Sequence, residues 1–571
     1  DKTIQTPDLY RTLMEDVIWG YDVLLSAVHL TASTIGLLSP EVAFDRMHLY
    51  CLPLGGASRS LGSIDFLSDS DLTINYSLLE TVDESKRVTG TGDITEIAHL
   101  PELDLCVMNP PFTRSVGGNL LFGSLPQKER TALQKVLARK LKTGQVKASS
   151  TAGLGSVFVA VADTRIKKNG RLAVILPRAL VSGAAWEKTR DLLSGAYAVE
   201  YVIVSHDPGR WNLSENTELS EVLVIARSLK EASATATTRT LFINLWRNPT
   251  NLVEAISAAE CIKQCSPVDI EDESQEGTSS LQIGNTKLGE AISIPCTRLR
   301  TMPVWYPQSF AQTELVRAVH WLCSGVVYIP GYETAKNTIP SCNLGSLAQL
   351  GPDARDIHDG FSVSSHPTPY PAFWSHSTKE VQTLHQIPNA YLSPLSKAKP
   401  GRSLRKPSLL WPRAGNVVMA ERLRTNTQRL VAAWIEEEVL ANVWWPIRLT
   451  DGLDDRAAKA LVLWLNSTLG ILSLWAYRGE TEGSWVKFKK PILERLPLLD
   501  VSSLTPSQLN AMVSGFEHVC NRELQPFPEM AVDAVRRDID AWISEALDLP
   551  DFSSLRLLLS QEPIVSSNRV G

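Results

Sequence analysis

The sequence predicts an α/β protein that has a second, less regular domain. Short apolar runs alternate with helical patterns throughout residues 17–228, and this alternation favours a doubly wound, mostly parallel sheet. From about residue 300 to residue 500 the alternation disappears, and Trp, Pro and Gly become frequent. That change predicts an irregular α+β domain. Residues 531–548 show an amphipathic pattern, which predicts a helical C-terminal segment.

The same changes of pattern predict where the domains begin and end. A weakly hydrophobic stretch, KEASATATTR, follows the last strand of the first domain and is typical of a linker. We expect a first domain at 1–232, a connector at 233–300, a second domain at 301–500 and a helical segment at 501–571.

Composition excludes several classes of protein. The net charge of the 571 residues is −6, so any site for a polyanion must be a local patch. The eight Cys are scattered and complete no zinc pattern; we expect no metal site and a reducing, cytoplasmic compartment. The apolar stretch 457–477 contains Asn466 and Gly470, so a packed helix pair is expected there and not a membrane span.

The first strand and helix place an acidic residue at a position that often binds ligands. VIWGYDV at 17–23 predicts a strand that ends at Asp22, and LLSAVHLTASTIGLL at 24–38 predicts the helix that follows. An acidic residue at the tip of such a strand binds ribose hydroxyls in Rossmann-like folds. Capping of the helix explains the same residue equally well.

A second acidic residue follows in the sequence LGSIDFL. Residues 48–55 predict another strand, and the turn at 61–67 could place the carboxylate of Asp65 over a nucleoside. Residues 80–99 are polar and are expected to be rich in loops.

The run LDLCVMNPPF predicts a buried strand that ends in a stiff turn. Leu103 to Met108 form the strand, and Pro110 stops it because proline donates no hydrogen bond to a neighbouring strand. The turn then lies at the carboxyl edge of the sheet, where open α/β sheets bind ligands. Asn109 offers a planar amide and Phe112 a stacking face. With the fixed carbonyl groups of Pro110 and Pro111, they suit a flat heterocycle with an exocyclic amino group. A strand-ending turn with a packed Phe is the plainer alternative.

The rest of the first domain continues the alternation, with Gly170 expected to end the second helix. Helices are expected at 128–142, 151–166 and 182–195, and strands at 171–177, 198–205 and 220–228.

The second domain contains one basic stretch, KAKPGRSLRKPSLLWPRAG at 397–415, which has no acidic residue. Such cations would meet the phosphates of a nucleic acid, although a solvated loop is the commoner role of a basic run. The basic residues are Lys397, Lys399, Arg402, Arg405, Lys406 and Arg413.

The order of these features resembles a known enzyme family. Asp22 after a strand, Asp65 in GSIDFL and then NPPF after a strand are similar to the motifs of S-adenosylmethionine-dependent methyltransferases that act on the N6 amine of adenine in DNA. The strand KNGRLAVILP and the basic second domain resemble the large enzymes of type I, type IIG and related phage-defence systems. The resemblance covers about residues 10–228, and residues 465–498 resemble the end of a target-recognition domain. It implies a Rossmann-like methyltransferase sheet, then a target-recognition domain, in a restriction-modification system.

The resemblance also implies a mechanism. The side-chain oxygen of Asn109 and the carbonyl of Pro110 would accept hydrogen bonds from the adenine amine and expose its lone pair. Catalysis would then depend on positioning and fixed dipoles, without a covalent intermediate. Pro111 would keep the turn rigid. Phe112 would stack on the base, which must be flipped out of double-stranded DNA.

The implied cofactor is S-adenosylmethionine. By resemblance, Asp22 and Val23 would bind its ribose, Asp65 and Phe66 its adenine, and Asn109 would border it as well. The implied partners are double-stranded DNA and other subunits of a defence complex, with no membrane.

One departure from the family concerns the methyl donor. The glycine-rich loop that holds the methionine moiety should precede the Asp22 strand, and residues 1–16 contain no such loop. We therefore expect that the chain lacks the amino-terminal part of the enzyme or receives it from another polypeptide. Two alternatives stay open: a methyltransferase that acts on RNA or on a protein glutamine, and a DNA-binding subunit that is catalytically incomplete.

Overall fold

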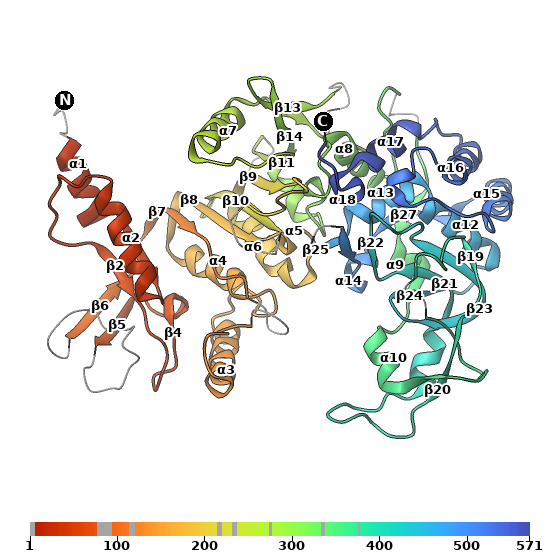
Figure 1. The fold of residues 1–571 in the computed structure, drawn as a ribbon, viewed down its shortest axis with the longest axis horizontal. Helices are drawn as coiled ribbons and strands as arrows, with labels where there is room; N and C mark the ends of the chain where they lie inside the picture. Colours follow the sequence, from red (N-terminus) through yellow and green to blue (C-terminus); the bar gives the residue numbers. More distant parts are fainter. Residues whose placement is uncertain are drawn as a thin grey trace. The chain divides into compact units, whose positions relative to one another are not determined.

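The computed structural model divides into two compact units, which are described one by one (Figure 1). The first unit comprises Asp1–Leu176, Ala185–Ala198 and Ile225–Ser233, and the second comprises Pro177–Ala184, Val199–Val224 and Ala234–Gly571. The structure describes residues 6–76, 94–113, 120–213, 220–230, 237–272, 277–332, 337–374, 377–482 and 484–570.

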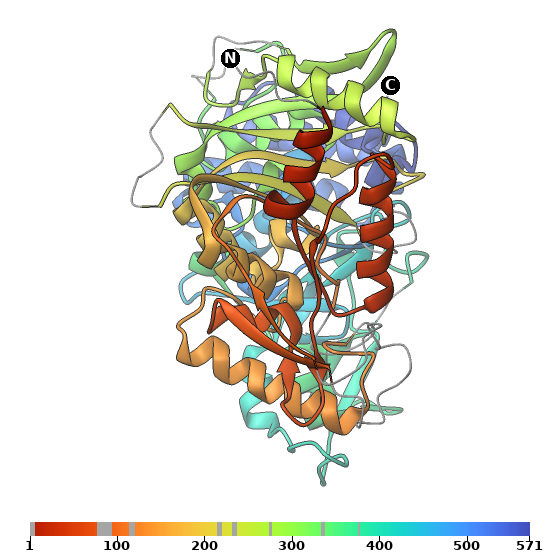
Figure 2. The ribbon, with the colours of Figure 1, turned by 90° about the vertical axis from the view of Figure 1, so that its left-hand side faces the viewer.

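The first unit begins with two helical segments and a small parallel sheet. A short helix, α1 (Thr6–Thr12), continues into a π-helical turn before the strands begin. Strand β1 (Trp19–Asp22) pairs in parallel with β2 (His48–Cys51), and helix α2 (Leu25–Leu37) connects them. The strand predicted at 17–23 and the helix predicted at 24–38 are thus confirmed. Figure 2 looks onto this part of the first unit, with α1 and α2 nearest the viewer.

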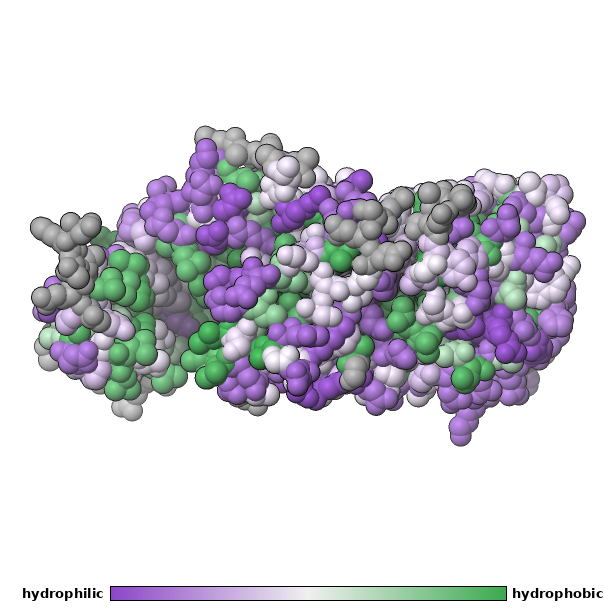
Figure 3. Space-filling view, turned by 90° about the horizontal axis from the view of Figure 1, so that it is seen from above, coloured by the Kyte–Doolittle hydropathy of each residue, from purple (hydrophilic) through white to green (hydrophobic). Residues whose placement is uncertain are grey.

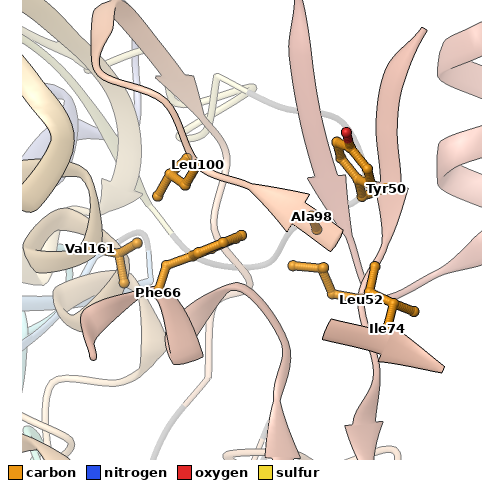
Figure 4. Close-up of a cluster of buried hydrophobic side chains, with 7 residues drawn as sticks. All are labelled: Tyr50, Leu52, Phe66, Ile74, Ala98, Leu100 and Val161. Carbon is orange, nitrogen blue, oxygen red and sulfur yellow. The ribbon is translucent and has the colours of Figure 1, made fainter. Parts of the chain in front are cut away.

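A hydrophobic cluster holds the β1–β2 sheet to its neighbours (Figure 4). After the hairpin of β3 (Leu54–Gly55) and β4 (Ser60–Leu61), a 3-10 helix, η2 (Gly62–Leu67), places Phe66 in the cluster. Trp19, Tyr21 and Leu103 pack against the cluster from outside. The buried members are Tyr50, Leu52, Phe66, Ile74, Ala98, Leu100 and Val161.

A hairpin occupies part of the region that the sequence indicated as loop-rich. Strands β5 (Asp71–Tyr76) and β6 (Ile94–His99) pair antiparallel. Residues 80–93 of the expected loop region lie outside the described residues. The expectation of loop was wrong for 94–99, because pairing with β5 and burial of Ala98 stabilise a strand that its own polarity does not indicate.

One of the two eight-stranded sheets is mixed. Its strands are β7 (Leu103–Met108), β8 (Ile166–Pro177), β9 (Tyr197–Ser205), β10 (Glu221–Ser228), β11 (Arg239–Leu245), β12 (Val268–Asp269), β13 (Ser279–Ile283) and β14 (Thr286–Pro295). The order is β12-β14-β11-β9-β10-β8-β7, and β13 also pairs with β14. Strand β7 is parallel to β8 and β9 is parallel to β11, whereas β11 is antiparallel to β14. The chain therefore has a mixed α/β fold, and the doubly wound, Rossmann-like topology stays a prediction.

The predicted helices of the first domain are present with shifted ends. They are α3 (Gln127–Thr143), α4 (Leu154–Arg165) and α6 (Glu187–Ala196), and a short helix that was not expected, α5 (Ala179–Ser182), precedes α6. Helix α4 ends before Gly170, which lies inside β8. A Cβ at Gly170 would lie 2.9 Å from the carbonyl oxygen of Leu103 on β7, so this glycine serves strand packing and does not end the helix as expected.

The described residues of the expected connector, 233–300, contain strands and a helix. They supply β11 to β14 and helix α7 (Leu252–Gln264). Ile243, Ala258 and Ala291 from these elements are buried in one cluster. Strand β11 pairs on both of its edges, with β9 and with β14, and such long-range pairing is not visible in a local composition pattern.

The region expected to be irregular also contains a sheet. Its strands are β16 (Ala348–Leu350), β17 (Phe361–Ser364), β18 (Pro371–Phe373), β19 (His385–Gln386), β20 (Ala390–Pro394), β21 (Gly415–Ala420), β23 (Ala432–Ala441) and β24 (Trp444–Leu449). The order is β16-β24-β21-β23-β18-β20-β17, with β19 paired to β23. Two short strands, β22 (Arg422–Arg424) and β26 (Trp485–Lys487), pair with each other beside β25 (Gly479–Glu482). Residues 301–500 are therefore more regular than the sequence indicated.

The apolar stretch near residue 465 forms the packed helix pair that was predicted. Helices α12 (Asp455–Asn466) and α13 (Thr468–Ala476) bend by 73° at Ser467. The buried amide of Asn466 donates to the carbonyl of Ala432 and accepts from the backbone N–H of Val431. Within the described ranges no single helix is long and apolar enough to cross a membrane, and only this bent pair meets the length and composition criteria jointly.

The C-terminal segment is helical, as predicted. Its helices are α15 (Pro506–Val519), α16 (Ala534–Leu547), α17 (Ser553–Gln561) and α18 (Pro563–Ser566). Helix α15 starts with a capping box in which the side chains of Thr505 and Gln508 bind each other's backbone N–H groups.

Candidate functional site

The segment Asn109–Phe112 follows directly from the carboxyl end of β7. Met108, the last residue of β7, lies opposite Val174 of the parallel strand β8. Beyond it Asn109 and Pro111 are exposed, Pro110 is buried and Phe112 is half-buried. In the part of the chain that the structure describes, no hydrogen-bond partner is recorded for the Asn109 side chain. Its amide is therefore available to a ligand at the carboxyl edge of a parallel strand pair.

Thr113 fixes the far end of this turn on helix α4. The hydroxyl of Thr113 accepts a hydrogen bond of 3.1 Å from the backbone N–H of Leu154, the first residue of α4. Gly153 precedes the helix with φ 105°, and a Cβ there would lie 2.0 Å from the carbonyl oxygen of Thr113. Neither residue was predicted to belong to the site, although the glycines of TAGLG indicate a close approach of backbone segments.

The thiol that precedes the turn is not activated. Cys106 lies on β7, and burial raises the pKa of its thiol to about 11. The thiol is therefore protonated near neutral pH and is a poor nucleophile.

Asp22 has one carboxylate oxygen engaged locally and one oxygen free. Its Oδ1 accepts from the backbone N–H of Leu24 at 2.8 Å, at the start of α2. No partner of Oδ2 is found among the residues described. The side chains of Asp22 and Val23 are half-buried. The N-cap residue of α2 is Leu24, and no side chain caps the helix, so Asp22 does not act as the cap that the alternative expected. Its second oxygen is able to accept from a hydroxyl group.

Asp65 makes two contacts. Its Oδ2 accepts from the backbone N–H of Leu61 at 2.7 Å, and its Oδ1 lies 3.0 Å from Nζ of Lys140 on helix α3. Each oxygen has a further lone pair, so the carboxylate could accept one more hydrogen bond. These contacts fix its orientation.

The turns that contain Asp22 and Asp65 meet at Gly62. This glycine has φ 64°, and a Cβ on it would lie 2.6 Å from Cγ1 of Val23. The structure thus brings Val23 and the η2 turn together. No hydrogen bond or ring contact among the described residues links Asn109–Phe112 to either of these turns. Leu103, at the start of β7, packs on the cluster that contains Phe66.

The side chain of Phe66 belongs to the hydrophobic core of the first unit. It is 2% exposed, and its ring lies edge-on to Tyr21 with 5.2 Å between centroids. Only its backbone could face a cofactor in this arrangement, so its predicted contact with the cofactor would be made by backbone atoms.

Strand β7 and helix α2 expose apolar side chains in the first unit. Leu105 and Val107 alternate along β7 and are 58% and 72% exposed. Leu30 and Leu37 of α2 are 70% and 75% exposed, and Figure 3 shows hydrophobic residues gathered at the end of the molecule where Figure 1 draws α1 and α2. Strand β7 is the last strand in its sheet order.

The basic stretch of the second unit divides into anchored and free residues. Arg402 lies 2.9 Å from Asp359, and Arg405 lies 3.2 Å from Asp356, both acids being in helix α10 (Ala354–Gly360). Arg413 is half-buried and its guanidinium lies 3.4 Å from the carbonyl oxygen of Gly351. The exposed lysines without a recorded partner among the described residues are Lys397, Lys399 and Lys406.

A metal site was not expected. Among the described residues no group of three or more His, Cys, Asp or Glu side chains is placed to hold a metal ion.

Comparisons with known proteins give remote similarities. No protein-family model matches the chain, and no curated protein matches its sequence. Among solved structures, it is similar to the type IIG restriction endonuclease BpuSI, with 12% identity over 81% of this chain and 53% of that one, at a TM-score of 0.30. The chain is also similar to a DrdV–DNA complex, with 10% identity over 75% of this chain and 45% of that one, at a TM-score of 0.32. A third similar structure is the ATP-dependent type ISP restriction-modification enzyme LlaBIII bound to DNA. Its identity is 9% over 98% of this chain and 42% of that one, at a TM-score of 0.36. The chain spans about half of these proteins or less.

Proposed function

We propose that the protein transfers a methyl group from S-adenosylmethionine to N6 of adenine in double-stranded DNA, within a restriction-modification or related phage-defence system. The observation that carries the proposal is the exposed, unengaged amide of Asn109 at the carboxyl end of β7. Its turn contains two prolines and is tied to α4 by the hydrogen bond from Leu154 to Thr113. A rigid acceptor is what an aromatic amine needs, because its lone pair is delocalised until the hydrogens are drawn out of the ring plane.

The proposed chemistry uses the Asn109 side-chain oxygen and the Pro110 carbonyl as acceptors for the two N6 hydrogens. An uncharged amide suits this role because it accepts a hydrogen bond without removing a full proton. Fixed dipoles of this kind cost no reorganisation during the reaction. Phe112 stacks on the flipped base. A protonated thiol at Cys106 fits a mechanism without a covalent enzyme intermediate.

The methyl donor lies near the turns that meet at Gly62. The free Oδ2 of Asp22 accepts from a ribose hydroxyl, and Asp65, oriented by Lys140, accepts from the donor's adenine amine. S-adenosylmethionine supplies the electrophilic methyl group when bound. Lys397, Lys399 and Lys406 of the second unit meet DNA phosphates, whereas Arg402 and Arg405 hold their loop to α10.

The test measures transfer of a labelled methyl group by the full chain to double-stranded DNA, to RNA and to a protein substrate that contains glutamine. Label recovered as N6-methyladenine in DNA supports the proposal. Label in RNA or protein alone overturns it in favour of the related enzymes. Binding of DNA without transfer to any substrate, in the presence of bound donor, overturns it in favour of a DNA-binding subunit.

A further inference from the structure

Helix α3 of the first unit presents a row of cations on one face. With 3.6 residues per turn, four basic positions of the helix fall within about 60° of arc. All four side chains are exposed, and no partner is recorded for any of them in the described part of the chain. They are Lys128, Lys135, Arg139 and Lys142, here named the cationic stripe.

The helix uses its other faces to hold itself in place. Leu133 and Leu137 are fully buried. Glu129, the only acidic residue of α3, accepts a hydrogen bond of 2.7 Å from the backbone N–H of Gly56 in the β3–β4 hairpin. Lys140 pairs with Asp65. The charges of Glu129 and Lys140 are thus engaged by the fold, and no acid on the helix neutralises the stripe.

A groove of about 680 Å³ runs along the stripe. Lys128, Lys135 and Arg139 line it, and Arg59 from the tip of the β3–β4 hairpin lines it as well. None of its lining residues is acidic. Lys128 and Arg139 are separated by about 16 Å along the helix axis, a length that corresponds to about five phosphates of one DNA strand at 3.4 Å each.

We propose that the cationic stripe is a second binding surface for the phosphate backbone of double-stranded DNA, on the same unit as Asn109. This inference rests on the proposed function, which requires DNA at that unit. It is distinct from the basic stretch of the second unit. Figure 1 draws α3 on the first unit, and the four side chains of the stripe are exposed.

The chemistry of the stripe favours DNA over two other polyanionic partners. An amphipathic helix that binds a lipid surface inserts large apolar side chains, and no large apolar residue of α3 is exposed. A protein partner would also be expected to use buried apolar anchors at the centre of its interface. A row of cations with no exposed large apolar residue on the same helix fits a ligand recognised by its charge, as the DNA backbone is.

The test measures the affinity of the full chain for a double-stranded oligonucleotide by fluorescence anisotropy. The KCl concentration is varied from about 50 to about 200 mM, the range over which affinity that depends on phosphate contacts falls steeply. The triple variant K128Q/K135Q/R139Q removes three cations and keeps residues of good helix propensity. The matched control K168Q/K188Q/K230Q removes three exposed lysines of the same unit that do not share a helix face. Thermal unfolding verifies that both variants are folded.

The expected result is a salt slope that is smaller by about 2 to 3 in the stripe variant, with affinity at least about tenfold weaker at the lower salt. The control should keep the slope of the unchanged chain within about 0.5. Equal slopes for the stripe variant and the unchanged chain overturn the proposal, as does an equal loss in the control. Salt-dependent binding of a polyglutamate peptide in place of DNA would also overturn it.

Methyl transfer at saturating DNA and low salt is measured in parallel. The control variant should keep the rate of the unchanged chain, because none of its three exposed lysines is assigned to the catalytic turn or to a DNA-binding surface. Stripe-dependent DNA binding without any methyl transfer would contradict the proposed function and leave the stripe assignment standing. Methyl transfer to DNA, together with a salt slope of DNA binding that does not change in the stripe variant, would support the proposed function and overturn the stripe assignment.

Discussion

Nζ of Lys140 lies 3.0 Å from Oδ1 of Asp65, and this ion pair ties helix α3 to the turn proposed to bind the methyl donor. Both side chains are largely buried, with 25% and 20% of their surface exposed. The same helix thus orients a donor-binding carboxylate from one face and presents the cationic stripe from another.

Asp65 and Lys140 are expected to have separable effects on the donor. Asp65→Asn removes the charge that accepts from the donor's amine and should weaken S-adenosylmethionine binding by about tenfold or more. Lys140→Gln keeps the carboxylate and should change donor affinity far less, while it destabilises the fold by about 1 kcal/mol. Titration calorimetry with the donor and urea unfolding measure the two effects. A greater loss of donor affinity in Lys140→Gln than in Asp65→Asn would contradict the assigned role.

The contact between Gly62 and Val23 predicts a coupled pair of substitutions. Gly62→Ala forces a side chain into a φ of 64° and against Cγ1 of Val23, so it should destabilise the fold by about 2 kcal/mol or more. In the double variant Val23→Ala/Gly62→Ala the steric part disappears, and a coupling of about 1 kcal/mol is expected from the cycle of urea unfolding free energies.

Gly56 provides the control for this cycle. It has φ 71°, and a Cβ there would meet nothing within 4 Å. Gly56→Ala should therefore lose only about 1 kcal/mol, from backbone strain. Additive effects of Val23→Ala and Gly62→Ala would show that the two turns are not packed as described.

Several elements follow from the local sequence, and these were predicted well. Helix α2, expected at 24–38, spans Leu25–Leu37, and α3, expected at 128–142, spans Gln127–Thr143. The end of the strand before Asn109 was also predicted, because Pro110 stops a strand wherever the chain goes next. Its burial was not: β7 is the last strand in its sheet order, and Leu105 and Val107 are exposed. Hydrophobic periodicity and proline act locally, so they predict the ends of helices and strands without knowledge of the fold.

The features that the sequence did not indicate depend on partners distant in the chain. Strand β11 lies in the predicted connector, and only its pairing with β9 and β14 makes it part of the sheet. Thr113 anchors the candidate catalytic turn through a contact with Leu154. From the sequence alone, Phe66 could be either a ligand contact or a core residue, and only its burial in the structure distinguishes the two.

The basic stretch of the second unit predicts two kinds of variant. Arg402→Gln/Arg405→Gln breaks the ion pairs with Asp359 and Asp356, and should lower the free energy of unfolding by about 1 kcal/mol because the arginines are about half-exposed. The three-lysine variant of Lys397, Lys399 and Lys406 to Gln should leave the unfolding free energy unchanged within about 0.5 kcal/mol. It should reduce the salt slope of DNA binding by about 2 to 3. An unchanged slope would identify the stretch as a solvated loop.

His320 predicts a loss of stability in acid. Its Nδ1 lies 2.8 Å from the hydroxyl oxygen of Tyr306, and burial lowers the pKa of His320 to about 4. In the unfolded state the imidazole binds a proton near pH 6.5. The contribution of neutral His320 to the free energy of unfolding is therefore complete above that pH and is lost as the pH falls toward 4. Between pH 8 and pH 5 the loss should be about 1 to 2 kcal/mol.

Urea unfolding of the unchanged chain and of His320→Gln at pH 8 and pH 5 isolates this contribution. The Gln amide can still bond to Tyr306 but does not titrate, so the variant should lose less stability in acid. The same acid loss in both proteins would assign it to other groups.

The most direct measurement compares the full chain and its Asn109→Ala variant for the yield of N6-methyladenine in double-stranded DNA, read by mass spectrometry after hydrolysis. Asn109 is exposed and without a recorded partner among the described residues, so the variant should fold normally and bind DNA with unchanged affinity. The methyl-transfer rate of the variant should fall by about 10²- to 10³-fold, the effect expected for the loss of one preorganised dipole. Equal rates in the two proteins would rule out Asn109 as the catalytic acceptor.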